Sequence, residues 1–329
     1  MPVPLDLSII IVNWNSAEFV RRCIVSLRRY TSGLSYEIIV IDNASFDGCD
    51  RMLREQNPEV RYIQSDRNLG FARANNLAAE GARGANLLFL NPDTEVTGPA
   101  IARLFGELSR LPAAGVVGAR LLNQDGTLQA SCVQSFPTII NQVLDSEWLR
   151  RRWPKSALWG TAPLYEAATA VAEVEGISGA CMMIRREVFE RVGRFSEDYF
   201  MFTEDLDLCY KARRSGWKNY YVPEASVIHF GGSSSKQAAS HFSSVMTRES
   251  IWRFLRKTRG NFYGLGYRCS MLISALCRLG LLGIMFPIQM LRCRRPAWTA
   301  SFGKWRAILW WSLRGEGWSA STGRSSPAT

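Results

Sequence analysis

Apolar and polar positions over the first forty-five residues follow alternating strand and helix patterns. Residues 7–13 (LSIIIVN) and 37–43 (EIIVIDN) are β-branched runs that end in polar residues, typical of strands buried on both faces of a parallel sheet. Between them, residues 16–30 give one apolar helical face behind a capping Ser16. This order predicts a β-α-β unit with a right-handed crossover.

The alternation continues to residue 93. A third strand is expected at 60–64, a helix at 71–82 and a fourth strand at 86–93. This spacing predicts an α/β fold with a doubly wound, Rossmann-like, mostly parallel sheet, and such sheets bind ligands beyond the carboxyl ends of their strands. Convergence on that edge is therefore expected for the polar residues that end three of the strands, Asn13, Asp42 and Asp93.

Beyond residue 94 the pattern is less regular. Residues 115–122 and 176–184 are predicted strands, and 123–174 is interpreted as a variable insert in which an acceptor-specific loop could lie. A flexible loop rich in glycine and serine follows at 229–237. We expect a catalytic region over 1–237, a basic, tryptophan-rich helical region over 238–318 and a disordered tail over 319–329.

The net positive charge of the chain lies in its C-terminal region. The chain has 40 Lys or Arg and 29 Asp or Glu, a net charge of +11, and from residue 251 onward it has 13 basic residues against Glu316 alone. The first 250 residues therefore hold 27 basic and 28 acidic residues. A nucleic-acid-binding protein is one alternative for such a tail, but the α/β region offers no basic face to a duplex.

The C-terminal region is also apolar. Residues 267–292 are interrupted by Arg278 and Pro287, and the uninterrupted part, 279–290, is too short to cross a bilayer. Flanking arginines and six of the eleven tryptophans suit helices in the headgroup region of an anionic leaflet. The alternative is a helical subdomain packed on the sheet. The N-terminus has no basic segment typical of a secretion signal, so the chain is expected in the cytosol, at the inner face of the membrane.

Several classes of site lack their signatures. The chain has neither G-x-G-x-x-G nor a P-loop lysine, which argues against a dinucleotide dehydrogenase and a P-loop NTPase. Its eight cysteines include no C-x-x-C pair, and two histidines leave few ligands for zinc.

The stretch YFMFTEDLDLCYKARRSGW, residues 199–217, places three carboxylates beside apolar side chains. One interpretation is a helix start, with Thr203 as the cap and acidic residues favoured by the helix dipole. On this stretch alone the helix start is the favoured interpretation, and any catalytic role for the carboxylates depends on the rest of the chain.

Three further residues are candidates with structural alternatives. Asp42 could accept the N3–H of uracil or thymine, or could only shape the following turn. Asp93 could hold a hard cation, and His229 could be its second ligand, which would favour Mn²⁺. Gly70 lies at a helix start, where backbone can approach a ligand closely and N–H groups can face a phosphate.

Taken in order, the segments IIIVNWN, IVIDNASFDG, NLGFARANN, LFLNPD, GISGACMMIRREVFERVGRFSEDYFMFTEDLDLCYKARRSGW and VIHFGGSS resemble the family 2 inverting glycosyltransferases. The resemblance covers roughly residues 7–235 and is closest to bacterial rhamnosyltransferase-like members that build O-antigen and other cell-surface polysaccharides. It implies a GT-A fold, a nucleotide-sugar donor, and Mn²⁺ or Mg²⁺.

The resemblance also implies residue roles. Asp205 matches the general base, with Glu204 as its less favoured substitute, and Asp93 and His229 match metal-site residues. Asn91 stands where the family's D-x-D motif has its first acid. An apolar rim is expected from Phe200, Met201, Phe202 and Trp217. Contacts to the nucleotide sugar are expected from Asn13, Asn15, Asp42, Asn68, Gly70, Arg73, Asn75 and Trp217.

The implied activity is transfer of one sugar from a dTDP- or UDP-sugar, with dTDP-rhamnose the leading donor, to a lipid-linked glycan at the inner membrane surface. The Q-x-x-R-W signature of processive synthases is missing, which favours a single transfer. No nucleic-acid partner is expected. An inactive, transferase-like membrane scaffold is the remaining alternative.

Overall fold

The computed structural model describes residues 5–144, 152, 153, 156, 169–231, 241–291 and 295–314. Residues 145–168 of the expected insert, apart from 152, 153 and 156, lie outside these residues, as do the boundary at residue 237 and the tail at 319–329, so the division of the chain stays a prediction.

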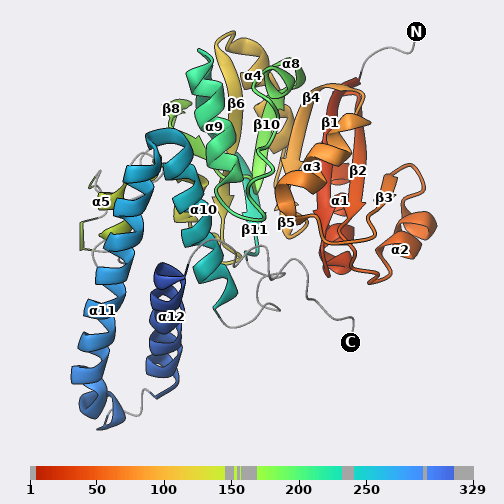
Figure 1. Ribbon diagram of the computed structural model, residues 1–329. Helices are drawn as coiled ribbons and strands as arrows, with labels where there is room; N and C mark the ends of the chain where they lie inside the picture. Colours follow the sequence, from red (N-terminus) through yellow and green to blue (C-terminus); the bar gives the residue numbers. More distant parts are fainter. Residues whose placement is uncertain are drawn as a thin grey trace.

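A central sheet carries the fold (Figure 1). Within the described residues it contains nine strands, with β8 (Ala172–Val174) pairing with β11 beside the main path. In spatial order the main path is β3 (Arg61–Gln64), β2 (Tyr36–Asp42), β1 (Leu5–Asn13), β4 (Gly84–Leu90), β10 (Cys181–Arg185), β6 (Ala114–Leu122), β11 (Lys218–His229) and β5 (Thr94–Val96).

The first four strands in this order are parallel, which confirms the α/β prediction for the N-terminal part. The last seven residues of β1 and the last five of β2 are buried, as their unbroken apolar runs predict. The helices of this region are α1 (Ala17–Tyr30), α2 (Cys49–Gln56), α3 (Gly70–Glu80), α4 (Ala100–Arg110), α8 (Arg186–Arg191) and α9 (Glu204–Arg214).

The sheet departs from the predicted pattern in three places. β10 runs antiparallel between β4 and β6, so the sheet is mixed beyond β4. The predicted strand at 176–184 is two strands, β9 (Gly176–Ile177) and β10, and the predicted strand at 86–93 stops at Leu90. The break between β9 and β10 and the end of β4 at Leu90 both lie at the carboxyl edge of the sheet, where the candidate residues lie.

A smaller unit covers this edge. The 3₁₀ helix η1 (Ala130–Cys132) leads into β7 (Val133–Gln134), which pairs with β9 in a second, two-stranded sheet. The short helix α5 (Ile139–Val143) follows, and its capping Thr138 accepts a hydrogen bond from the Asn141 backbone N–H. The segments η1, β7 and α5 lie within residues 123–174, which the sequence analysis interpreted as a variable insert.

Three helices complete the described chain: α10 (Phe242–Arg259), α11 (Asn261–Leu291) and α12 (Arg295–Leu313). A second hydrophobic core joins them to the loop before α9 through Tyr199, Val245, Trp252, Leu255 and Trp311. In Figure 1, α11 and α12 (blue) form an antiparallel hairpin that projects away from the sheet.

α11 corrects one sequence-based expectation. Arg278 and Pro287 do not interrupt it, because one helix runs from Asn261 to Leu291. A proline inside a helix removes one backbone hydrogen bond but does not have to end the helix. Residues Asn261–Phe286 are long and apolar enough to cross a membrane, with a mean hydropathy of 1.9 over an 18-residue window.

Candidate active site

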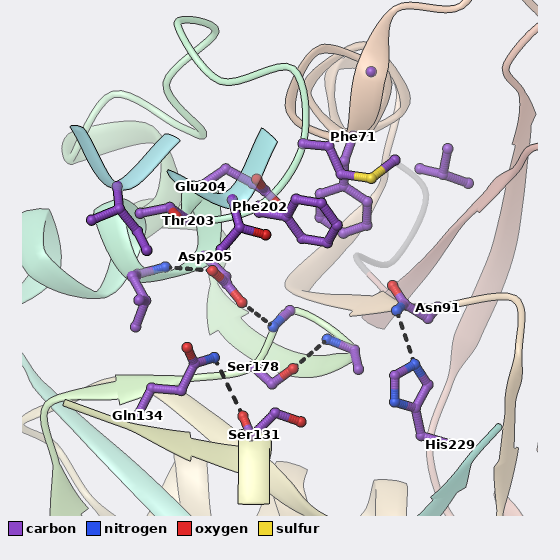
Figure 2. A pocket seen from close by; sticks show the side chains of 18 of the residues that line it. Phe71, Asn91, Ser131, Gln134, Ser178, Phe202, Thr203, Glu204, Asp205 and His229 are labelled. Carbon is purple, nitrogen blue, oxygen red and sulfur yellow. Dashed lines mark hydrogen bonds between the residues drawn. The ribbon is translucent and has the colours of Figure 1, made fainter. Parts of the chain in front are cut away.

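A cavity of about 420 Å³ opens at the carboxyl edge of the sheet (Figure 2). Its walls come from the ends of β1, β4 and β11, the Ser178–Ala180 turn, the start of α9, and the β7–α5 and α10 segments. The cavity therefore brings together residues that are far apart in the sequence.

Asp93 and His229 meet at one end of the cavity. Pro92 follows Asn91 in the turn after β4, and this turn places the buried Asp93 carboxylate 3.3 Å from His229 Nε2. The Asn91 side-chain amide also lies 3.3 Å from His229 Nε2. The structure thus brings together the two residues expected at a metal site, with Asn91 beside them.

Gln129 fixes the orientation of the His229 ring. Its Nε2 donates to the His229 backbone carbonyl at 2.6 Å, so its Oε1 is the atom that lies 2.9 Å from His229 Nδ1. An oxygen acceptor at Nδ1 selects the tautomer with the proton on Nδ1. The lone pair of Nε2 is therefore directed toward Asp93 and Asn91, as ligation requires.

The charges of the cavity fit a divalent cation. Among the described lining residues there are three carboxylates, Asp93, Glu204 and Asp205, and neither lysine nor arginine. A diphosphate in such a site needs a positive partner, and Mg²⁺ or Mn²⁺ can bind through one carboxylate and one further protein ligand while keeping several waters. No cluster of three His, Cys, Asp or Glu side chains suited to a metal occurs in the described chain, so Asp93 and His229 would be its principal ligands.

The catalytic candidates lie at the start of α9. Phe202 and Thr203 both have a φ of 69°, an uncommon conformation for residues other than glycine. Thr203 precedes the helix but makes no side-chain capping bond, so the interpretation of this segment as an ordinary capped helix start fails for its hydroxyl. The sharp turn instead places Phe202, Glu204 and Asp205 in the wall of the cavity.

Asp205 is held by two backbone donors (Figure 2). Its Oδ2 accepts from Gly179 N–H at 2.8 Å, and its Oδ1 accepts from Leu206 N–H at 2.8 Å. Burial raises the pKa of Asp205, and these N–H groups oppose the rise because they stabilise the ionised form. The Gly179 contact exists because the predicted 176–184 strand breaks at this turn.

The Glu204 carboxyl group is buried beside that of Asp205. Burial and the neighbouring charge of Asp205 raise the pKa of Glu204 well above its usual range. Its Oε2 is buried and has no hydrogen-bond partner in the described chain. Burial raises the pKa of both carboxyl groups, but two backbone N–H groups stabilise the ionised form of Asp205, which makes Asp205 the better placed of the two to act as a base.

Asp207, the third carboxylate of this stretch, is not part of the cavity. It is fully buried and accepts from Ser196 Oγ at 2.5 Å, and Lys257 Nζ of α10 lies 3.1 Å from its Oδ2. Ser250 Oγ of α10 also donates to the Met201 carbonyl at 2.8 Å. These contacts fix α10 against the catalytic loop.

Asp42 lies behind the cavity wall. It is fully buried and accepts from Asn13 Nδ2, Gln64 Nε2 and the backbone N–H groups of Ser45 and Phe46 at 2.9–3.2 Å. These donors occupy both oxygens, so the geometry does not support Asp42 as a reader of the base. Asn13 is its register partner on β1 and is likewise buried.

The start of α3 approaches the cavity, but its N–H groups are used within the protein. Gly70 has a φ of 76°, and a Cβ there would lie 2.3 Å from the Phe200 carbonyl oxygen. The N–H groups of Leu69, Gly70 and Phe71 donate to Asn43 Oδ1, Asn68 Oδ1 and Phe200 O, so they do not face a phosphate as expected. Asn68 and Gly70 do line the cavity.

Four other expected contact residues are not brought to the cavity. Asn15 is exposed, Arg73 is exposed beside Glu197, and Asn75 donates to the Phe71 carbonyl inside α3. Trp217 packs against Gly115 beyond the far end of α9, because the carboxylates stand in the first turn of this eleven-residue helix and Trp217 follows its last residue, Arg214. Phe202 and Met201 line the cavity, but Trp217 does not join them in the expected rim.

A sequence profile for glycosyl transferase family 2 matches residues 8–193, and one for glycosyl transferase family group 2 matches residues 135–315. The chain is 30% identical over 248 residues to the N-acetylglucosaminyl-diphospho-decaprenol L-rhamnosyltransferase of Mycobacterium tuberculosis strain H37Rv, covering 71% of this chain and 80% of that protein. It is 26% identical over 267 residues to rhamnosyltransferase WbbL of Escherichia coli K12, covering 76% and 93%.

Two solved structures are similar in fold. Mannosyltransferase PcManGT from Pyrobaculum calidifontis, in complex with GDP-Man and Mn²⁺, matches with a TM-score of 0.57 and 16% identity over 94% of this chain and 86% of that one. GalNAc-T7 with UDP, GalNAc and Mn²⁺ matches with a TM-score of 0.56 and 19% identity, over 78% and 48%. Identities this low establish the shared fold alone.

Proposed function

The chain belongs to glycosyltransferase family 2 and has a GT-A fold, and on that premise we propose that it is an inverting, metal-dependent transferase of a single sugar. The proposed donor is a pyrimidine nucleotide sugar, dTDP-rhamnose, and the proposed acceptor is a hydroxyl of a lipid-linked glycan in cell-surface polysaccharide synthesis. The named rhamnosyltransferases support the sugar and the acceptor class. One observation carries the proposal: Asp205, whose carboxylate accepts hydrogen bonds from two backbone N–H groups, shares a cavity with Asp93 and His229.

The transfer follows from this placement. The acceptor hydroxyl donates its proton to Asp205 while its oxygen attacks the anomeric carbon, on the face opposite the diphosphate. The bond between that carbon and the diphosphate oxygen breaks, and the nucleoside diphosphate leaves with the electron pair. A divalent cation at Asp93 and His229 would offset the charge on this leaving group, so no second carboxyl group is needed as an acid. Phe202 and Met201 reduce the access of water to the base.

Nucleotide release across a panel of sugar donors tests the proposal. Purified protein with Mn²⁺ or Mg²⁺ is expected to release nucleotide fastest from dTDP-rhamnose among dTDP-, UDP- and GDP-sugars. The GDP-sugars matter because Asp42 is not exposed to select a pyrimidine, and a preference for them would contradict the proposed donor class. No turnover and no thermal stabilisation with any nucleotide diphosphate would contradict the proposed transferase activity itself.

We also propose that the α11–α12 hairpin attaches the enzyme peripherally to the inner face of the cytoplasmic membrane. Only 11% of the apolar window in α11 is buried, and Leu276, Leu281, Ile284 and Phe286 are exposed. Arg278 stacks on Trp305 between α11 and α12, a pairing suited to the headgroup region. The sequence after α11 carries Arg292, Arg294 and Arg295, a charge cluster that disfavours translocation of the hairpin tip.

Vesicle flotation tests this attachment. The protein is expected to float with vesicles that contain anionic phosphatidylglycerol more than with neutral phosphatidylcholine vesicles, and alkaline carbonate is expected to release it. Ile284→Glu should weaken flotation severalfold, because it places a charge on the exposed apolar face. Leu77→Glu, an exposed leucine on α3, is the matched control and should float normally. Retention after carbonate would indicate a spanning helix instead.

A further inference from the structure

The cavity extends beyond the carboxylates, away from the metal-site residues. In Figure 2, Asn91 and His229 lie on one side of Ser178, and Gln134 and Ser131 lie on the other. This second part is walled by β7, α5 and α10, which contribute Gln134, Gln142, Thr247 and Ile251. Asp205 lies between the two parts, so a molecule in the second part would reach the base from the side away from the metal site.

The wall of this second part of the cavity is polar but carries no charge. Gln142 Nε2 donates to Asn141 Oδ1 at 3.1 Å, and Gln134 Nε2 donates to the Ser131 carbonyl at 3.3 Å. Within the described chain, neither Gln142 Oε1 nor Gln134 Oε1 has a hydrogen-bond partner. Thr247 donates its hydroxyl proton to the Ser243 carbonyl at 2.7 Å, which leaves its oxygen able to accept. The wall therefore presents hydrogen-bond acceptors, which match a neutral ligand that carries several hydroxyl donors.

α10 connects this wall to both the base and the hairpin. Lys257 is paired with Asp207, two residues after Asp205, so Thr247 is fixed relative to the base. The chain passes from α10 through Gly260 directly into α11. In Figure 1, α10 lies between α9 and the α11–α12 hairpin. A ligand that is anchored in a membrane at the hairpin would therefore meet this wall on its way to Asp205.

We infer that the second part of the cavity is the acceptor subsite, where Gln134, Gln142 and Thr247 bind the hydroxyl groups of an uncharged pyranose. The inference rests on the proposed function and specifies its acceptor side. The pyranose lies between α5 and α10 with Ile251 against its apolar face, and its reactive hydroxyl points to Asp205. The lipid portion of the acceptor extends toward α11.

The test measures how added sugars change nucleotide release from the donor. The probes are methyl glycosides of neutral hexoses, of rhamnose and of N-acetylglucosamine, and N-acetylglucosaminyl farnesyl diphosphate. We expect at least one probe to accelerate release by accepting the sugar, or to slow it by displacing the hydrolytic water. Thr247→Val and Gln142→Ala should each raise the half-effective probe concentration roughly threefold to tenfold, as loss of one hydrogen bond predicts. Each probe effect is expressed relative to the release that the same variant shows without a probe.

Thr258→Val is the matched control. Thr258 also lies on α10 and donates to a carbonyl four residues earlier, at 2.7 Å, but it does not line the cavity, so its replacement should leave the probe effect unchanged. Two outcomes overturn the inference while donor turnover persists: no probe changes nucleotide release, or the variants respond to probes as the wild type does. Absence of donor turnover in the wild type would instead contradict the proposed function, and the inference with it.

Discussion

Replacement of Asp205 by asparagine is expected to lower the transfer rate about 10²- to 10⁴-fold, the usual contribution of a general base. The amide cannot take the acceptor proton. Binding of the nucleotide diphosphate and metal should persist, because Asp205 lies apart from Asp93 and His229 in the cavity. The measurement is single-turnover transfer together with nucleotide affinity. Retention of most of the wild-type rate would remove Asp205 from its proposed role.

Glu204→Gln is the matched control for this change. Burial and the charge of Asp205 both raise the pKa of Glu204 and therefore favour its neutral form. A neutral amide of the same shape should therefore retain activity within about tenfold, far above Asp205→Asn. If Glu204→Gln lowered the transfer rate more than Asp205→Asn does, Glu204 would be the base instead.

The pH profile gives an independent check. The base must be ionised, and burial raises the pKa of Asp205, so activity should fall with decreasing pH through a value above the ordinary aspartate pKa of about 3.9. Glu204→Gln should leave this acid limb nearly in place, because the residue it replaces carries no charge. Asp205→Asn should abolish the limb in its residual activity.

The second large effect is expected at the metal site. Asp93→Asn should weaken Mn²⁺ binding at least tenfold and reduce turnover in parallel, because it removes the carboxylate that faces His229 Nε2. Electron paramagnetic resonance of free Mn²⁺, with nucleoside diphosphate present, measures the affinity without relying on activity. Chelation of the metal should stop turnover, and added Mn²⁺ should restore it.

Glu95→Gln is the matched control for Asp93→Asn. It removes one negative charge two residues away, but Glu95 pairs with Arg22 outside the cavity. Equal loss of Mn²⁺ affinity in both variants would indicate a general charge effect. Unchanged affinity in Asp93→Asn would exclude Asp93 as a ligand.

The strand pattern predicted that Asp93 lies at the carboxyl edge, whereas the roles of Asp205 and His229 were inferred from the family resemblance; all three line the cavity. The sequence could not predict which strand-end residue faces the cavity. Asp42 and Asn13 are register partners on neighbouring strands and bond to each other, a pairing that depends on the alignment of β1 with β2 rather than on either run alone. Asn43, one position further on, lines the cavity instead.

Other residues carried no local signal. Gln129 orients His229 across a separation of 100 residues, and Gln142 and Thr247 reach the cavity from a short helix and from α10. The prediction for Trp217 was wrong for the opposite reason: Trp217 is close to Asp205 in sequence but follows the C-terminal end of α9, whose eleven residues span about 16 Å at 1.5 Å per residue. Patterns predict elements, whereas contacts between distant elements depend on how these elements pack.

The attachment of α10 to the catalytic loop has a consequence for exchanging parts between related transferases. Two contacts make α10 part of the catalytic unit: the ion pair of Lys257 with Asp207 and the hydrogen bond from Ser250 to the Met201 carbonyl. The change in composition near residue 237 would instead suggest a junction before α10. A chimera joined before α10 would bury Asp207 without Lys257. The better crossover is Gly260, whose φ of 90° separates α10 from α11, so that a foreign hairpin could be grafted while the catalytic loop keeps its own support.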